Sequence, residues 1–533
     1  MREFSTYIEQ YLANGLRPET YNERNEPYLH KALNVRATTS GLRPHTPIVN
    51  PFSGVSVTAF PFPQLYIGEA GSLLLAQNYI ARVNRSVTPW DISLLPVSPI
   101  DELPGTAIPD GGAWHIADMR GAFYAFSGAC NAALLRDNST LLIDRKILIN
   151  TGTHYKGRIV VGGIDPTEIW SRGWEEILTF WDKNRDNMLP DLPMDDIGSS
   201  YVMWGSIGGG DFPLWLFDPS IIHRGPIGEP TRDGTYRLPA DQSYAIDKIR
   251  TGQFGFMPIP YAGTIHCVKP LGNGVMVYGS DGISYLPHVS MEPAPTFGLQ
   301  LVASFGIAGR GCVTGTDSMH VFMDDNGDIW RITADMSLNR LGYKEWFVDM
   351  LGGPITMSFN TQLADTYISD GVSTFVLTDS GLTEMPQHPT SINHVSGGVI
   401  GVYSESLVET EPEVFEPDAQ GLIVTNTVDM NLRAQKTVTG VGVGISTENV
   451  ASVAIDYRFT KGEEYRRTRF VPLNREGNAV IRVAGTEFRV VLHIDSAEDV
   501  EIDYIKLRWQ SHDKRAIRGV DDSMAIPEEG GTL

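Results

Sequence analysis

Apolar, strand-like segments separated by short polar turns dominate the middle of the chain, and three of the turns share one pattern. Each places a small polar or acidic residue two positions before a glycine, at Gly282, Gly327 and Gly381, and an apolar segment precedes it. In the first two, an aromatic residue follows the glycine by three positions, at Tyr285 and Trp330. The pattern predicts three β-hairpins in which the glycine supplies a positive φ at the turn.

The spacing of these hairpins predicts a β-propeller. The glycines lie 45 and then 54 residues apart, close to the ~40–50-residue period of a four-stranded propeller blade. Short apolar strands continue this rhythm from about residue 112 to residue 404, a length that suits six blades. Three unrelated hairpins in a large β protein would give the same local pattern, and the sequence leaves that alternative open.

The chain beyond the propeller predicts a second β domain. Apolar and polar residues alternate cleanly over 453–459, 488–494 and 500–509, which indicates long antiparallel strands with one solvent-exposed face. The fold class is therefore all-β, a six-bladed propeller with a β-rich platform or sandwich. The predicted parts are an N-terminal β-rich platform segment (1–110), the propeller (111–404), an acidic linker (405–418), a C-terminal β-sandwich (419–519) and a disordered acidic tail (520–533).

Two stretches predict helix. Tyr7, Ile8, Tyr11 and Leu12 recur at helical spacing near the N-terminus, and six large apolar residues share one face of residues 167–184.

Composition narrows the class of protein. The chain has 533 residues with 42% apolar content, and its longest apolar runs are too short to span a membrane. The N-terminus is polar without an apolar signal core, so we expect synthesis in a cytoplasm without export by that route. The three cysteines are far apart in sequence and show no metal-binding or redox spacing, which predicts buried thiols.

The charge is strongly negative, with 64 Asp and Glu against 42 Lys and Arg and a net charge of −22. So acidic a chain is a poor candidate for gripping nucleic acid, because phosphate binding needs cations. A conduit that passes DNA without holding it would suit this charge, and solubility alone would also explain it.

One hairpin carries candidate chemistry. Asp325 to Trp330 resembles the Asp box of sialidases and related propellers, which is a structural hairpin in that family. Asp324, Asn326 and Asp328 alternate like the oxygen ligands of a calcium loop, but the expected glycine and the terminal glutamate are missing. A turn rich in Asp and Asn is the simpler interpretation, and these three residues remain weak candidates for a metal site.

We find no motif for catalysis or for a cofactor. The glycine-rich stretch 205–210 has no following lysine, so it predicts a flexible loop and not a phosphate cradle. The histidines, including His115 and His320, are scattered singly, and no nucleophile elbow or Cys/His arrangement occurs. The sequence therefore predicts a protein that is not an enzyme, with no catalytic, cofactor-binding or established metal residues.

Several segments resemble a known family. These are residues 34–36, 41–44, 305–311, 502–509 and 513–519, together with the propeller between them. They are similar to the nozzle, or tail tubular protein, of short-tailed bacteriophages, over essentially the whole chain. The resemblance implies a propeller beside a β-rich platform built from both chain ends.

The resemblance also implies a function. Six copies would form a ring that extends the DNA channel below the portal and tail adaptor, would gate the DNA, and would carry fibres or spikes. Double-stranded DNA would pass through the lumen without specific binding, and the protein would belong to the virion tail, assembled in the host cytoplasm. The alternative is a carbohydrate-binding or glycan-depolymerising propeller used in host recognition, for which the many aromatic residues provide material.

Overall fold

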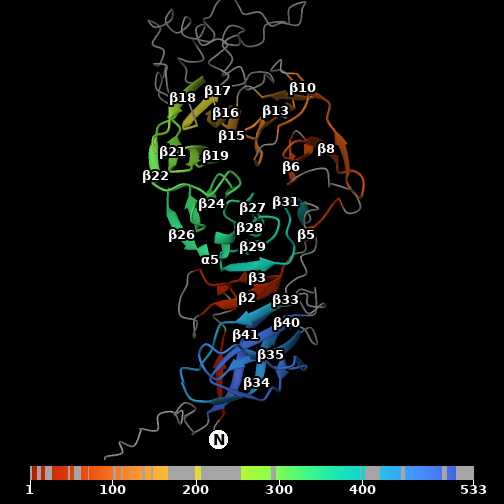
Figure 1. Ribbon diagram of the computed structural model, residues 1–533, viewed down its shortest axis with the longest axis vertical. Coiled ribbons are helices and arrows are strands. Elements are labelled where there is room, and N and C mark those ends of the chain that lie inside the picture. The colour runs from red at the N-terminus through yellow and green to blue at the C-terminus, as the bar shows by residue number, and fades with distance from the viewer. Residues whose placement is uncertain are drawn as a thin grey trace, which may run out of the picture. The chain divides into compact units, whose positions relative to one another are not determined.

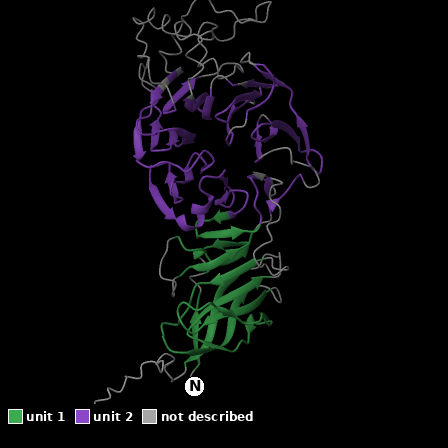
Figure 2. Cartoon of the chain, in the orientation of Figure 1, with its two compact units in different colours: residues 1–45, 375–386, 410–533 green, residues 46–374, 387–409 purple. Residues whose placement is uncertain are grey.

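The computed structural model divides the chain into two compact units, coloured separately in Figure 2. Unit 1 contains residues 1–45, 375–386 and 410–533, and unit 2 contains residues 46–374 and 387–409. The structure describes residues 3–8, 12, 14–18, 27–45, 48–52, 62–69, 71–99, 104–109, 112–119, 122–134, 139–145, 148–165, 199–205, 254–289, 296–395, 398–402, 421–445, 451–494 and 501–511.

Unit 2 consists of small antiparallel sheets, each built from strands that follow one another along the chain. Four sheets have four strands. They are β6 (Gln64–Gly68), β7 (Gly71–Leu75), β8 (Ile80–Asn84) and β9 (Asp91–Leu94); β15 (Leu148–Tyr155), β16 (Arg158–Asp165), β17 (Tyr201–Gly205) and β18 (Phe254–Pro258); β19 (Ile265–Leu271), β20 (Gly274–Gly279), β21 (Ile283–Pro287) and β22 (Gln300–Ala303); and β23 (Val313–Gly315), β24 (Met319–Met323), β25 (Ile329–Thr333) and β26 (Leu338–Gly342).

Two further sheets are completed by parallel pairing. One contains β10 (Val97–Pro99), β11 (His115–Met119), β12 (Ala122–Phe126), β13 (Asn131–Leu134) and β14 (Leu141–Asp144); the other contains β5 (Ile48–Val49), β31 (Ser391–Val395) and β32 (Gly398–Val402). The six sheets are the blades of a six-bladed β-propeller (Figure 1), which confirms the predicted all-β class. The hairpin of β27 (Thr356–Asn360) and β28 (Asp365–Ser369) also enters the ring, where β27 lies beside β23 and β31.

The propeller closes through residues far apart in the chain. Ile48 of β5 pairs with Val399 of β32, which joins the start of unit 2 to its end. Apolar side chains pack between neighbouring blades, as where Leu74 of β7 lies in one buried cluster with Val402 of β32. Because Ile48 and Leu74 take part in these contacts, the propeller includes residues that the sequence assigned to the N-terminal platform segment, and unit 2 begins at residue 46 and not at 111.

Unit 1 is a β unit of two sheets built from both ends of the chain. One sheet has the order β3 (Val35–Thr38), β4 (Gly41–Pro44), β41 (Ile502–Ser511), β34 (Lys436–Ile445) and β38 (Asn478–Ala479), with β1 (Glu3–Tyr7) also on β41 and β39 (Val483–Gly485) also on β34. The other has the order β29 (Thr374–Leu377), β30 (Leu382–Met385), β2 (Leu29–Leu33), β33 (Gly421–Thr425), β40 (Glu487–Ile494), β35 (Ala451–Arg458) and β36 (Arg466–Arg467), with β37 (Val471–Pro472) also on β35.

The N-terminal helix prediction is wrong at its start. Residues Glu3–Tyr7 form β1, which pairs antiparallel with β41. Phe4 stacks on Trp509 with ring centroids 4.9 Å apart. The stacked aromatic ring at this edge therefore stabilises a strand pair that includes Tyr7. Leu12 and Asn14 are helical, so the helix prediction holds for the later part of the segment.

The three alternating segments are strands as predicted, β35, β40 and β41, but the expected exposed face is present mainly on β41. β35 and β40 are buried over most of their length. Some of their polar residues form ion pairs: Arg458 Nε donates to Glu487 Oε2 at 2.6 Å with both side chains buried, and Asp456 Oδ1 accepts at 2.7 Å from Nε of the half-exposed Arg467 on β36. Part of the polar half of the alternation is therefore engaged in ion pairs.

Several predicted segments lie outside the described residues. These are the helix at 167–184, the loop over 206–210, the acidic linker at 405–418 and the tail at 520–533. The three cysteines are buried and free, as predicted.

Candidate functional site

The predicted Asp-rich hairpin is present between β24 and β25, and its carboxylates are used internally. Asp324 Oδ1 accepts the backbone N–H of Asn326 at 2.9 Å and of Asp328 at 2.8 Å, and its Oδ2 accepts the indole N–H of Trp330 at 2.9 Å. Asp328 faces Arg340, whose Nη2 lies 3.1 Å from both carboxylate oxygens. The geometry explains these residues as turn structure, and no cluster of potential metal ligands occurs in the described part of the chain.

Glycine is required at the three hairpin turns for two different physical reasons. Gly327 has φ +88°, the left-handed conformation that the sequence predicted. Gly282 and Gly381 have no such φ, and the prediction is wrong for them. A Cβ at Gly282 would lie 2.5 Å from the carbonyl oxygen of Tyr261, and one at Gly381 would collide with the carbonyl oxygen of Asn14, so close backbone approach requires glycine at both turns.

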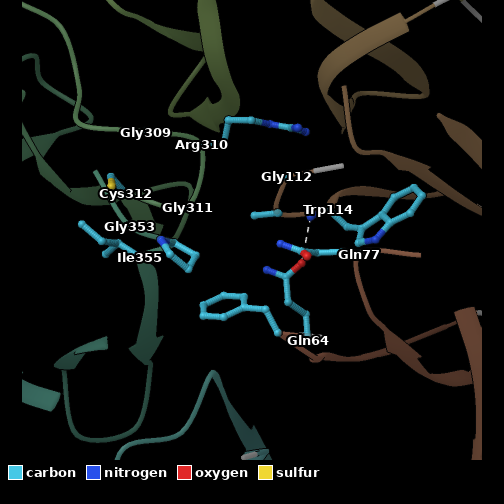
Figure 3. Close-up of a pocket in the computed structure, with 13 residues that line it drawn as sticks. Gln64, Gln77, Gly112, Trp114, Gly309, Arg310, Gly311, Cys312, Gly353 and Ile355 are labelled. Atoms are coloured by element: carbon cyan, nitrogen blue, oxygen red, sulfur yellow. Dashed lines mark hydrogen bonds between the residues drawn. The ribbon is translucent and has the colours of Figure 1, made fainter. Parts of the chain in front are cut away.

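The candidate functional site is a pocket in unit 2 (Figure 3). Its volume is about 180 Å³, and its lining comes from β6, from the β7–β8 turn, from the segment before β11, from the β22–β23 connection and from the segment before β27. The backbone N–H of Trp114 donates to Gln64 Oε1 at 2.8 Å across this pocket, and its indole N–H donates to the carbonyl oxygen of Ala76 at 2.8 Å. Both polar groups of Trp114 are therefore committed to the fold.

Arg310 is the charged group of the site. It comes from the β22–β23 connection, and its guanidinium donates to the backbone carbonyls of Phe126 (3.0 Å), Ser127 and Asn150 on two preceding blades. Burial lowers the pKa of Arg310 to about 10, and its Nε is buried without a hydrogen-bond partner among the described residues. The side chain is a clamp: one cation on one connection holds three carbonyls of two other blades.

Glycine makes room for this clamp. A Cβ at Gly112 would lie 2.9 Å from Arg310 Nη1, and one at Gly128 would lie 2.8 Å from the same atom. Both glycines lie next to the guanidinium of Arg310, so a larger residue at either position would displace that guanidinium.

His115 extends the network. Its Nε2 lies 2.9 Å from the carbonyl oxygen of Arg310, and because a carbonyl only accepts, Nε2 carries the proton. Its Nδ1 therefore accepts from the Thr151 hydroxyl at 2.6 Å, and that hydroxyl oxygen accepts the backbone N–H of Val268 at 3.0 Å. Burial, with a smaller effect of the Arg310 charge, lowers the pKa of His115 to about 3, so the ring is neutral near pH 7.

The chemistry available in the pocket is limited to hydrogen bonding and positive charge. Its lining residues include no carboxylate. Cys312 lines it, but burial raises the pKa of this thiol to about 12, so it is not a thiolate at neutral pH. The described residues here bind blades together and offer no proton donor or nucleophile tuned to neutral pH.

Sequence reasoning missed this site. The sequence does not distinguish Arg310 as a functional residue, and it shows His115 and His320 only as single histidines far from other candidate ligands. In the structure His320 is buried in a second network, with Nδ1 2.8 Å from the Tyr278 hydroxyl and Nε2 2.9 Å from the carbonyl oxygen of Pro270. The available signal is the glycine at 311, next to Arg310, where a Cβ would collide with the carbonyl oxygen of Ile355.

The comparisons with known proteins add little. Within the described part of the chain, no helix is long and apolar enough to cross a membrane. No protein-family model matches the chain, and no curated protein does.

Several solved structures show a weak likeness. Apo AztD from Citrobacter koseri is 8% identical, with 63% of this chain and 79% of that chain covered and a TM-score of 0.32. BamB from Moraxella catarrhalis is 9% identical, with 64% and 90% covered and a TM-score of 0.30. An exo-beta-1,3-galactanase from Phanerochaete chrysosporium is 8% identical, with 87% and 100% covered and a TM-score of 0.25. With TM-scores this low, the likeness carries no argument about function, and the propeller assignment rests on the sheets of the chain itself.

Proposed function

We propose that this chain is a structural component of a bacteriophage tail, a nozzle subunit that forms a six-membered ring below the portal and adaptor. The ring extends the DNA channel, and fibres or spikes attach to it. The observation that carries the proposal is the construction of unit 1 from both chain ends, with the propeller inserted between them.

The junction of the two ends is extensive. All five residues of β1 pair with β41, from Glu3 opposite Gln510 to Tyr7 opposite Lys506. Arg43, from the N-terminal part, forms an ion pair with Glu501 at 2.7 Å. This is the arrangement that the resemblance implies, a propeller with a platform made by both ends, and it supports the nozzle proposal more directly than any short motif.

The pocket in the propeller is too small to admit a DNA duplex. Its volume is about 180 Å³, and the Arg310 clamp connects blades beside it. In the proposed assembly DNA therefore passes between copies, through the middle of the ring, and each propeller is a wall element.

Electron microscopy tests the proposal. We expect purified protein, alone or mixed with the tail adaptor, to give six-fold rings with an open centre in negative stain. Monomers in both samples would contradict the nozzle assignment. We also propose that loops narrow the bore before ejection, and a single-particle map of the unejected tail without a constriction would contradict that part.

A glycan array separates the nozzle from a host-recognition propeller. A conduit should bind no glycan specifically, whereas a recognition protein should bind a defined set. Specific binding of a defined set of glycans would therefore argue against the nozzle and for the recognition propeller.

A further inference from the structure

The two units carry opposite charge. The described residues of unit 1 contain 16 Lys and Arg against 11 Asp and Glu, whereas those of unit 2 contain 10 against 15. The described parts are therefore +5 and −5, and the overall −22 arises from residues outside them. The described residues are thus not uniformly acidic, and the two units of one copy have net charges of opposite sign.

On unit 2, an exposed valine lies among carboxylates. Val348 opens the short helical segment η3 (Val348–Met350), which follows α5 (Lys344–Phe347), and it is 45% exposed. Glu345 and Asp349 are exposed on the same two turns, with Lys344 as their basic neighbour.

The Asp-rich hairpin adds a third carboxylate to this surface. A Cβ at Gly327 would lie 3.5 Å from the backbone nitrogen of Val348, so the tip of the hairpin packs on the start of η3. Asp325, two residues before that glycine, is exposed. We call Val348, Asp325, Glu345 and Asp349 the acidic patch.

On unit 1, an exposed valine lies among arginines. Val480 follows β38 and is 81% exposed, the highest value among the large apolar residues described. Arg475, on the turn before β38, and Arg482, just before β39, are both exposed, with Glu476 as their acidic neighbour. We call Val480, Arg475 and Arg482 the basic patch.

We propose that the basic patch of one copy docks on the acidic patch of the next copy. An apolar centre surrounded by charge is the usual anatomy of a protein interface, and complementary charge fixes partner and orientation. Two different patches on one chain make a heterologous contact, which repeats from copy to copy and closes into a ring when the rotation between neighbours divides a full turn. This inference rests on the proposed ring function and names the surfaces that form it.

Cysteine cross-linking of full-length chains tests the contact. One chain carries Val348→Cys and the other Val480→Cys, and the two are mixed in equal amounts under mild oxidation at low salt. We expect a covalent dimer only in the mixture, because a heterologous contact never brings either position to its own copy. The native cysteines do not compete, since all three are buried.

Matched variants locate the contact. Replacing the Val348→Cys chain with a Val372→Cys chain, whose valine is 59% exposed at another site, should give no dimer. Adding Arg475→Glu and Arg482→Glu to the Val480→Cys chain should lower the yield about tenfold. Adding Glu345→Lys and Asp349→Lys to the partner chain should then restore it.

The outcomes separate this contact from the ring itself. Six-fold rings without the cross-linked product would overturn the contact and leave the nozzle proposal standing. The product without rings would support the contact and contradict the nozzle. If no product forms and Arg475→Glu/Arg482→Glu abolishes retention on heparin, the basic patch serves a polyanion and the proposal is overturned.

Discussion

Replacing Arg310 with methionine should loosen the centre of the propeller measurably. The guanidinium donates to three backbone carbonyls, those of Phe126, Ser127 and Asn150. A hydrogen bond from a charged donor contributes about 1.5–3 kcal/mol, so three contribute on the order of 4–9 kcal/mol before any offset.

The offset is the cost of burying the cation. The pKa of Arg310 falls from 12.5 to about 10 on burial, which corresponds to about 3 kcal/mol. Methionine removes that cost, and water in the adjoining pocket can reach the freed carbonyls. We therefore expect a net loss of about 3 kcal/mol in the local free energy of opening.

Hydrogen exchange measured by mass spectrometry on the full chain gives the readout. A loss of about 3 kcal/mol corresponds to about 150-fold faster exchange of amides in β12 and β15, while β35 and β40 of unit 1 should not change. Arg340→Met is the matched control, because its ion pair with Asp328 is half exposed on the arginine side and should be worth less than about 1 kcal/mol. Exchange in Arg310→Met within about threefold of the native rate would refute the clamp.

Three other sets of substitutions test buried groups and close contacts within each unit. Burial lowers the pKa of His320 to about 3 from 6.5, so only the unfolded chain binds a proton between these values. The free energy of unfolding should fall by up to about 5 kcal/mol as pH drops through this window, and urea titrations of His320→Gln should show a flatter pH dependence. Arg458→Met removes the arginine partner from the buried carboxylate of Glu487, which should cost about 3–5 kcal/mol in urea unfolding, with Arg458→Met/Glu487→Leu recovering most of the loss. Gly282→Ala places a Cβ 2.5 Å from a backbone carbonyl oxygen and should cost about 1–3 kcal/mol, whereas Gly309→Ala, whose nearest neighbour lies 3.9 Å away, should be near neutral; equal thermal shifts for the two would contradict the close-approach explanation.

The fold was predictable where its signals are local. The turn at Gly327 and the indole of Trp330 lie within six residues of Asp324, so the whole hairpin network is written in one short stretch. The strands of unit 1 were likewise visible as alternation. The domain boundary was not, because it depends on pairing such as Ile48 with Val399, which no local pattern specifies.

The site was not predictable for a related reason. Arg310 contacts residues that lie 160 to 184 positions away, and it contacts their backbone carbonyls. Because every residue has a backbone carbonyl, the sequence contains no partner side chain that would indicate the contacts of Arg310. The role of His115 could not be predicted for the same reason, because one of its two hydrogen-bond partners is the backbone carbonyl of Arg310. Only the glycines that make room for these contacts leave a trace in the sequence.

The distribution of charge between the two units affects how strongly the proposed ring would repel DNA. Net charge predicts that the wall of the proposed ring repels DNA, but the described residues of the two units balance each other at +5 and −5. If the basic patch of each copy binds the acidic patch of the next, these charges neutralise one another at the contacts. The described residues then contribute little net charge to the field inside the ring. Raising the salt concentration should therefore weaken ring assembly and also reduce the repulsion of DNA, because screening acts on both.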